Sequence, residues 1–149
     1  MNSPSNATGL GGTMRINRGT DVVDIRTKIR ELCKKLDFSL AETTRVVTAT
    51  SELARNMVEF AGSGEVHWET LDGRKSSNDR KRKMGIKIVF EDHGPGIENI
   101  DWAMQDGAST GNGLGKGLPG TDKLMDDMNI ETEPDKGTKI TVIKWGNKK

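Results

Sequence analysis

Two stretches of the chain repeat apolar residues every three to four positions, which is the spacing of one face of an α-helix. They cover residues 20–36 and 39–61. Thr20 is a suitable N-cap for the first helix, and Ser39 begins the S-x-x-E capping box of the second. Gly62 follows the second stretch directly and is expected to end that helix. The pattern therefore predicts two amphipathic helices in succession.

Alternating apolar and polar positions predict the strands. The clearest strand covers residues 85–91, where Ile86, Ile88 and Phe90 point to one face. Further strands are expected over residues 13–17, 66–71, 130–132 and 139–145, and further helices over residues 100–105 and 118–128. Because helices and strands alternate along the chain, we expect an α/β or α+β fold with amphipathic helices covering one face of a sheet.

Two segments lack such a pattern. Residues 1–13 are mainly Ser, Asn, Gly and Thr, so we expect a disordered tail before a single domain at residues 14–149. Residues 72–83 contain six Lys or Arg and two Asp, a net charge of +4. We interpret this segment as a basic loop that connects two strands. An acidic partner or RNA is the alternative explanation for its charge.

The composition of the whole chain excludes several classes of function. With 149 residues, 23 Lys or Arg and 22 Asp or Glu, the net charge of +1 makes nucleic acid an unfavoured partner. No apolar run reaches the roughly 18 residues of a membrane span, and no signal peptide is recognisable, so we expect a cytoplasmic protein without a membrane partner. The single Cys33 excludes an internal disulfide and is expected to be buried and inert.

Glu52 and Asn56 are the first candidates for chemistry. They are four residues apart on the second helix and therefore point to the same face. The amide oxygen of Asn56 is a suitable ligand for Mg²⁺, and the Glu52 carboxylate can accept a proton from a hydroxyl group. The alternative is a solvent-exposed polar pair without a function.

Asp92 comes directly after the strand at residues 85–91. It is followed by Gly94 and Gly96, which flank a proline. An ionised carboxylate only accepts hydrogen bonds, so Asp92 matches the exocyclic amine of adenine. Glycines would let the backbone approach a flat ligand without a clash at Cβ. A simple turn after a strand is the alternative interpretation.

Residues 111–120 form a glycine-rich segment that contains Lys116 and leads into a predicted helix. Free backbone N–H groups at a helix N-terminus, together with a lysine, favour the binding of phosphate. The order of residues fits neither a P-loop nor a Rossmann fingerprint, and a flexible linker is the alternative. Gly137 and Thr138 open the last strand and mean little on their own.

Taken in this order, the four blocks resemble the boxes of the GHKL (Bergerat-fold) ATPase superfamily. Residues 51–56 resemble its N box, residues 92–96 its G1 box and residues 113–117 the G2 box of its ATP lid. Gly137 and Thr138 resemble its final Gly-Thr motif. The resemblance covers residues 15–145 and is greatest for the RsbT-type serine/threonine kinases of bacterial stressosomes. It implies a two-layer sandwich with a mixed sheet and helices on one face.

The same resemblance implies that the chain binds Mg-ATP. Asn56 would hold Mg²⁺, Asp92 would contact adenine with support from Thr138, and Glu52 would be the catalytic base. The implied nucleotide-binding positions are Asn56, Asp92, Gly94, Gly96, Ile97, Gly113, Leu114, Gly115, Lys116, Gly117, Leu118 and Thr138.

Three hypotheses for the function remain open. The first is a kinase that phosphorylates a STAS-domain regulatory protein and switches partners, with a phosphatase or a cyclase as a possible downstream effector. The second is an ATP-binding anti-sigma factor that sequesters a sigma factor, with phosphoryl transfer secondary. The third is a nucleic-acid binder that uses residues 74–83, against which the net charge near zero argues.

Overall fold

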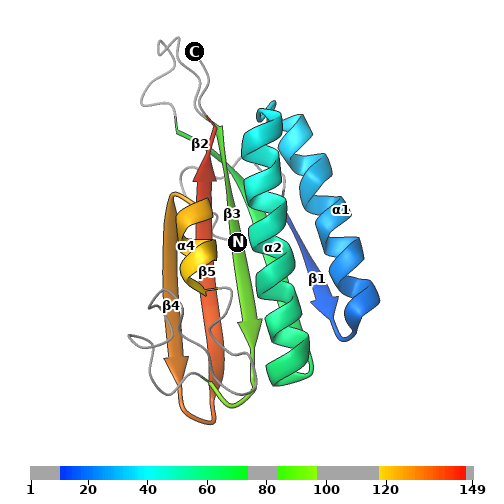
Figure 1. Cartoon of the computed structure of the whole chain (residues 1–149), viewed down its shortest axis with the longest axis vertical. Helices are drawn as coiled ribbons and strands as arrows, with labels where there is room; N and C mark the ends of the chain where they lie inside the picture. Colours follow the sequence, from blue (N-terminus) through cyan, green and yellow to red (C-terminus); the bar gives the residue numbers. More distant parts are fainter. Residues whose placement is uncertain (1–10, 74–83, 97–117, 147–149) are drawn as a thin grey trace.

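A five-stranded sheet carries helices on one of its faces (Figure 1). The computed structural model describes residues 11–73, 84–96 and 118–146. The strands are β1 (Gly12–Ile16), β2 (Gly64–Asp72), β3 (Met84–Asp92), β4 (Asp127–Glu133) and β5 (Gly137–Trp145). The helices within these ranges are α1 (Gly19–Lys35), α2 (Leu40–Ala61) and α4 (Leu118–Leu124). The predicted helix over residues 100–105 lies outside the described residues.

The strand order is β1-β2-β3-β5-β4, and all four pairings are antiparallel. The two-layer α/β arrangement is confirmed, but the expectation of a mixed sheet is wrong. The reason lies in the connections. Helices α1 and α2 run in opposite directions and return the chain to the end of the sheet where β1 stops, so β2 must run against β1 (Figure 1). The pairs β2–β3 and β4–β5 are neighbours in sequence and also run in opposite directions.

The hydrophobic core lies between the sheet and the two long helices. Ile86, Ile88 and Phe90 are buried on the helix-facing side of β3, as the alternation predicts. Cys33 is fully buried on α1, and burial raises the pKa of its thiol to about 12. A thiol with such a pKa stays protonated at neutral pH, so Cys33 acts as a small apolar side chain.

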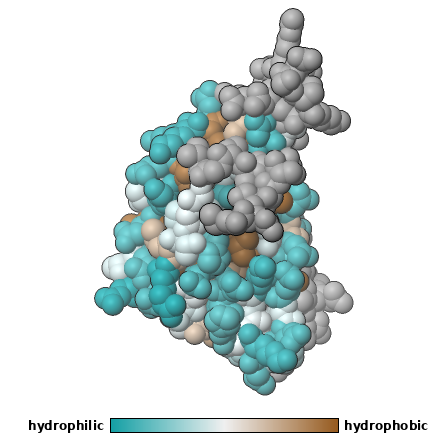
Figure 2. All heavy atoms as spheres, turned by 180° about the vertical axis from the view of Figure 1, so that it is seen from behind, coloured by the Kyte–Doolittle hydropathy of each residue, from teal (hydrophilic) through white to brown (hydrophobic). Residues whose placement is uncertain are grey.

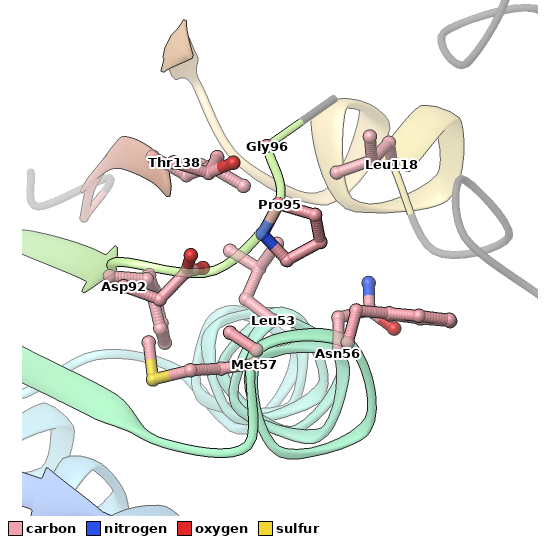
Figure 3. Close-up of a pocket in the computed structure, with 12 residues that line it drawn as sticks. Leu53, Asn56, Met57, Asp92, Pro95, Gly96, Leu118 and Thr138 are labelled. Atoms are coloured by element: carbon pink, nitrogen blue, oxygen red, sulfur yellow. The ribbon is translucent and has the colours of Figure 1, made fainter. Parts of the chain in front are cut away.

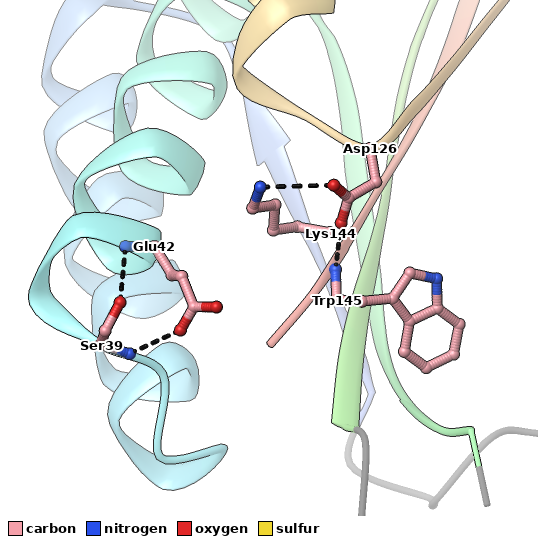
Figure 4. Close-up of polar contacts among 5 residues, drawn as sticks. All are labelled: Ser39, Glu42, Asp126, Lys144 and Trp145. Carbon is pink, nitrogen blue, oxygen red and sulfur yellow. Dashed lines mark hydrogen bonds and ion pairs between the residues drawn. The ribbon is translucent and has the colours of Figure 1, made fainter. Parts of the chain in front are cut away.

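The N-terminus of α2 confirms the predicted capping box (Figure 4). The Glu42 N–H donates to the Ser39 hydroxyl at 3.0 Å, and the Ser39 N–H donates to the Glu42 carboxylate at 2.8 Å. Two backbone donors that the helix cannot satisfy itself thus find partners. At the other end Gly62 has a φ of 84°, which confirms it as the residue that ends the helix.

The N-terminus of α1 differs from the prediction, because the helix begins at Gly19 and Thr20 is not its cap. The Asp21 carboxylate instead accepts the backbone N–H groups of Asn17 at 2.8 Å and Arg18 at 3.2 Å. An acidic side chain in the first turn also interacts favourably with the helix dipole. The Asp21 carboxylate in the first turn thus fixes the two residues that precede the helix.

Helix α4 ends at Leu124, four residues before the predicted end at Met128. Asp126 joins the sheet instead: its N–H donates to the Ile143 carbonyl at 2.9 Å. Its carboxylate accepts the Trp145 N–H at 2.7 Å and lies 3.4 Å from Lys144 Nζ (Figure 4). These bonds to β5 start strand β4 earlier than residue 130.

The edges of the sheet are β1 and β4. Strand β1 begins at Gly12, one residue before the predicted strand over residues 13–17, and so includes the last two residues of the predicted tail. Thr13 pairs with His67, and its hydroxyl lies 2.8 Å from His67 Nδ1. In β4 every second residue is exposed, including Glu131 and Glu133. Figure 2 shows that the described part of the sheet's other face is largely hydrophilic. Across the described residues, no helix has the length and apolar content needed to cross a bilayer.

Candidate functional site

A pocket lies between the last turns of α2 and the adjoining ends of β3 and β5 (Figure 3). Its polar side chains come from three segments far apart in the sequence: Asn56, Asp92 and Thr138. Its apolar walls are formed by Leu53, Met57, Phe60, Phe90, Leu118 and Ile140. Pro95 and Gly96, in the turn after β3, form part of the same wall. The structure thus brings together five of the predicted site residues: Asn56, Asp92, Gly96, Leu118 and Thr138.

Helix α2 presents one face to the pocket through Leu53, Asn56, Met57 and Phe60. These positions are spaced by three, four and seven residues, so they form one stripe on the helix. Asn56 is the polar member of an otherwise apolar stripe. Its carboxamide is therefore held at the pocket wall, where it can offer an oxygen ligand.

Glu52 does not line the pocket with Asn56. Its carboxylate instead accepts a hydrogen bond from Arg55 Nη1 at 2.9 Å, and Arg55 Nη2 donates to the Ser51 hydroxyl at 3.3 Å. Both charged side chains are substantially exposed. The structure therefore shows the helix ion pair that is the alternative to a catalytic role, and Glu52 as the base remains a prediction.

Asp92 is the one carboxylate in this pocket among the residues described. Burial raises the pKa of its carboxyl group above the ordinary value. Backbone hydrogen bonds from Gly94 and Thr138, and the charge of His93, oppose this rise but do not cancel it. The Gly94 N–H donates to Asp92 Oδ1 at 3.0 Å. These bonds fix the orientation of the carboxylate in a largely apolar setting.

The glycines around the pocket make room for neighbouring parts of the protein. A Cβ at Gly94 would lie 2.6 Å from the Cβ of Ala61, so this glycine lets the turn after β3 pack against α2. Gly137 has a φ of 107°, and a Cβ there would collide with the Asp92 carbonyl. Gly94 and Gly137 therefore have a packing role, and the expectation that Gly94 and Gly96 let the backbone approach a ligand stays a prediction.

The turn after β3 is also tied to the turn between β4 and β5. The Asp135 N–H donates to the Pro95 carbonyl at 2.7 Å. A Cβ at Gly96, whose φ is 79°, would collide with the Glu133 carbonyl. Thr138 lies on the strand that follows, and its hydroxyl is 3.0 Å from that of Thr132. The pocket wall is therefore held at both ends, by α2 and by the β4–β5 turn.

Sequence reasoning missed most of the apolar wall. Phe60 and Ile140 carry no motif, although Phe60 follows Leu53 by seven residues and Met57 by three, a spacing that places all three on one face of α2. Ile97 and the segment Gly113, Leu114, Gly115, Lys116 and Gly117, predicted to bind phosphates, lie outside the described residues.

The residues present fit an adenine nucleotide with a divalent cation. Apolar walls suit a flat aromatic ring, an acceptor-only carboxylate suits an exocyclic amine, and an amide oxygen suits Mg²⁺. Asp92, Asn56 and the walls around them supply all three.

Comparison with known proteins agrees with this geometry. Residues 41–146 match the model of the histidine kinase-, DNA gyrase B- and HSP90-like ATPase family. The chain is 42% identical over 132 residues to serine/threonine-protein kinase RsbT of Bacillus subtilis (strain 168), covering 89% of this chain and 94% of that protein.

Two anti-sigma F factors are also similar. The one from Clostridium kluyveri is 31% identical over 126 residues, covering 82% of this chain and 84% of the relative. The one from Thermoanaerobacter sp. is 28% identical over 123 residues, covering 80% and 82%. The resemblance predicted from the sequence blocks is confirmed, and the chain belongs to the histidine kinase-, DNA gyrase B- and HSP90-like ATPase family, within its branch of RsbT-type serine/threonine kinases.

Proposed function

We propose that this chain is a cytoplasmic, ATP-dependent kinase that phosphorylates a serine or threonine of a STAS-domain regulatory protein. In this role it switches between that substrate and a downstream effector, such as a phosphatase or a cyclase. The observation that carries the proposal is the pocket itself. Asp92 faces its apolar walls, and Asn56 lines it from α2. The 42% identity to a serine/threonine-protein kinase supports the same reaction.

Asp92 selects the base of the nucleotide. Its carboxylate accepts the amine of adenine, whereas guanine would place a carbonyl oxygen in that position and repel it. The backbone donors of Gly94 and Thr138 hold the carboxylate in place, so little reorganisation accompanies binding. Leu53, Met57 and Ile140 shield the ring from water.

Asn56 is the residue that would hold Mg²⁺. Its amide oxygen is neutral, so it can coordinate a cation without adding repulsion toward the phosphates. Bound Mg-ATP supplies the γ-phosphoryl group that is transferred and the cation that neutralises the phosphate charge. We assign the closure over the phosphates to the segment at residues 113–117, on the basis of the family resemblance.

Glu52 is the proposed catalytic base, and it acts on the hydroxyl group of the protein substrate. One helical turn separates it from Asn56, so the two can serve one site. In the structure its carboxylate is engaged by Arg55. Substrate binding must therefore release or share this ion pair before Glu52 accepts the proton. Because the pair is exposed, its loss costs about 0–1 kcal/mol.

The test is phosphoryl transfer from γ-labelled ATP to purified STAS-domain proteins of the same organism, followed by identification of the modified residue. We expect labelled serine or threonine with the wild type and strongly reduced label with Asn56→Ala. Val23→Ala, on the exposed side of α1, is the control and should transfer normally. Absence of transfer to every STAS-domain protein tested, with ATP binding intact, contradicts the proposal.

The similarity to two anti-sigma F factors favours one second candidate, an ATP-binding anti-sigma factor that sequesters a sigma factor. It predicts ATP-dependent retention of a sigma factor on the immobilised chain. The same labelled-ATP experiment separates the two: retention of a sigma factor without transfer to a STAS-domain protein supports the second candidate.

A further inference from the structure

A second recess lies between α1 and the first half of α2, away from the nucleotide pocket. The groove is bounded by residues 26–34 of α1 and by residues 40–48 of α2. The pocket residues of α2 begin later, at Leu53. The two helices lie side by side and run in opposite directions (Figure 1), and the residues that line the groove come from the C-terminal half of α1 and the N-terminal half of α2. A ligand seated here would leave the nucleotide pocket open.

One side of the groove is a row of cations, Arg26, Arg30 and Lys34. They are spaced by four residues, so about 6 Å separates each from the next along one face of α1. Among the described residues none of the three forms an ion pair, whereas Arg55, Lys87 and Lys144 each have a carboxylate within 4.0 Å of the side-chain nitrogen.

Arg26, the half-buried member of the row, has one side-chain nitrogen without a hydrogen-bond partner. Its Nε is buried and has no hydrogen-bond acceptor in the structure. A buried donor of a charged group without an acceptor costs free energy, because water no longer satisfies it. Because Nε itself is enclosed, an incoming carboxylate would meet the partly exposed remainder of this half-buried side chain rather than Nε.

The floor and opposite rim of the groove are suited to a protein. Phe38 and Val47 are buried and form an apolar floor. Leu40 stands at the rim with 84% of its surface exposed, the largest exposed fraction among the large apolar residues described. Exposed leucines are usual on their own, but one beside an apolar floor and a row of cations indicates contact with another molecule.

We propose that this α1–α2 groove docks an acidic amphipathic helix of a partner protein. A helix fits between two antiparallel helices by ridge-into-groove packing. Carboxylates at every turn of such a helix would meet Arg26, Arg30 and Lys34, and its apolar side chains would cover Leu40 and the floor. A nucleic acid would leave the apolar floor and Leu40 unused, so charge and shape together favour the protein. This inference does not depend on the proposed kinase activity.

The test measures binding of a fluorescein-labelled designed helix with glutamate at every turn beside a leucine stripe. The control peptide carries lysine in place of each glutamate. Fluorescence anisotropy is recorded for the full chain, for Arg30→Glu and Lys34→Glu, and for Lys35→Glu. Lys35 is exposed and next to Lys34 but does not line the groove, so the control has the same change in net charge.

We expect the acidic helix to bind the wild type and each groove variant to weaken binding by roughly tenfold, a common cost of removing one central interface side chain. Lys35→Glu should change the affinity by no more than about twofold, as exposed charges usually do. Leu40→Ser should weaken binding, and Val23→Ser, at an exposed apolar residue outside the groove, should not.

Melting temperatures and ATP affinity measured on the same variants show that the fold and the pocket are intact. The proposal is overturned if the acidic helix binds no better than the lysine control. It is also overturned if Lys34→Glu and Lys35→Glu weaken binding equally, which would indicate attraction by net charge alone. Tighter binding of a single-stranded oligonucleotide, lost in the same groove variants, would overturn it in favour of a nucleic acid.

Discussion

Helix α2 borders two recesses whose charged groups differ in sign and in exposure to solvent. At its C-terminal half the pocket encloses a carboxylate, Asp92, whose hydrogen bonds come from backbone N–H groups and whose pKa is raised by burial. At its N-terminal half the groove carries Arg30 and Lys34, both exposed at the edge of an apolar floor. An enclosed, oriented charge can select a small ligand by one hydrogen bond. A row of exposed charges instead selects a larger partner whose opposite charges have the same spacing.

The comparison implies that substitutions at the C-terminal half of α2 change nucleotide chemistry, while substitutions at its N-terminal half change stability or docking. The largest effect is expected for Glu52→Gln, which should lower phosphoryl transfer by about 10²–10⁴-fold, the usual contribution of a general base. ATP affinity should change little, because Glu52 does not line the pocket. Calorimetry and a transfer assay on the same protein measure both quantities.

Glu59→Gln is the matched control for that prediction. Glu59 is an exposed carboxylate on the same helix, and its side chain does not line the pocket. It should leave both quantities unchanged. Full transfer activity in Glu52→Gln would show that the carboxylate serves only its ion pair with Arg55.

The second effect concerns the selection of the base. Asp92→Asn should weaken ATP binding by about ten- to a hundredfold, because a hydrogen bond to a charged acceptor contributes roughly 1.5–3 kcal/mol. The preference for ATP over GTP should shrink with it. Glu91→Gln is the control, because Glu91 precedes Asp92 in β3 and points to the other face of the sheet. Equal affinities of wild type and Asp92→Asn for ATP, in calorimetry, would refute the role of Asp92.

The third effect tests the other end of α2. Ser39→Ala removes the hydroxyl that accepts the Glu42 N–H and should lower the free energy of unfolding by about 0.5–2 kcal/mol. ATP affinity should stay the same, because the capping box does not line the pocket. Urea unfolding and calorimetry measure the two quantities. A loss of ATP affinity comparable to that of Asp92→Asn would show that the two halves of α2 are coupled.

The smallest effect is a dependence of stability on pH. Because burial raises the pKa of Asp92 above the ordinary value of about 3.9, the folded chain keeps this proton where the unfolded chain has lost it. The contribution of Asp92 to stability therefore falls as pH rises from about 3.9 through the raised pKa, and is constant above it. Urea unfolding at several pH values should show wild type losing stability relative to Asp92→Asn over this interval. A gain relative to the variant would contradict the raised pKa.

Local signals in the sequence predict the parts of the fold that depend on neighbouring residues. The capping box at Ser39, the end of α2 at Gly62 and the alternation in β3 depend on hydrogen bonds or packing within one element. The ordered blocks also predict that Asn56 and Asp92 share a site, and the structure places both in one pocket.

The remaining features depend on contacts between distant segments. Helical spacing places Glu52 and Asn56 on one face of α2. It cannot show that the Glu52 carboxylate forms an ion pair with Arg55. The packing of Gly94 against Ala61 joins residues that no local pattern connects. Strand β4 starts early because Asp126 finds its partners on β5, which follows it in sequence.

Within the part of the chain that the structure describes, strand β4 lies at an edge of the sheet, where a strand from another molecule can add. Its exposed positions carry Asp127, Glu131 and Glu133. If two copies met edge to edge through β4, these carboxylates would bring negative charges together across the contact and repel one another. The acidic edge therefore opposes edge-to-edge aggregation, and this opposition weakens in concentrated salt, where the repulsion is screened.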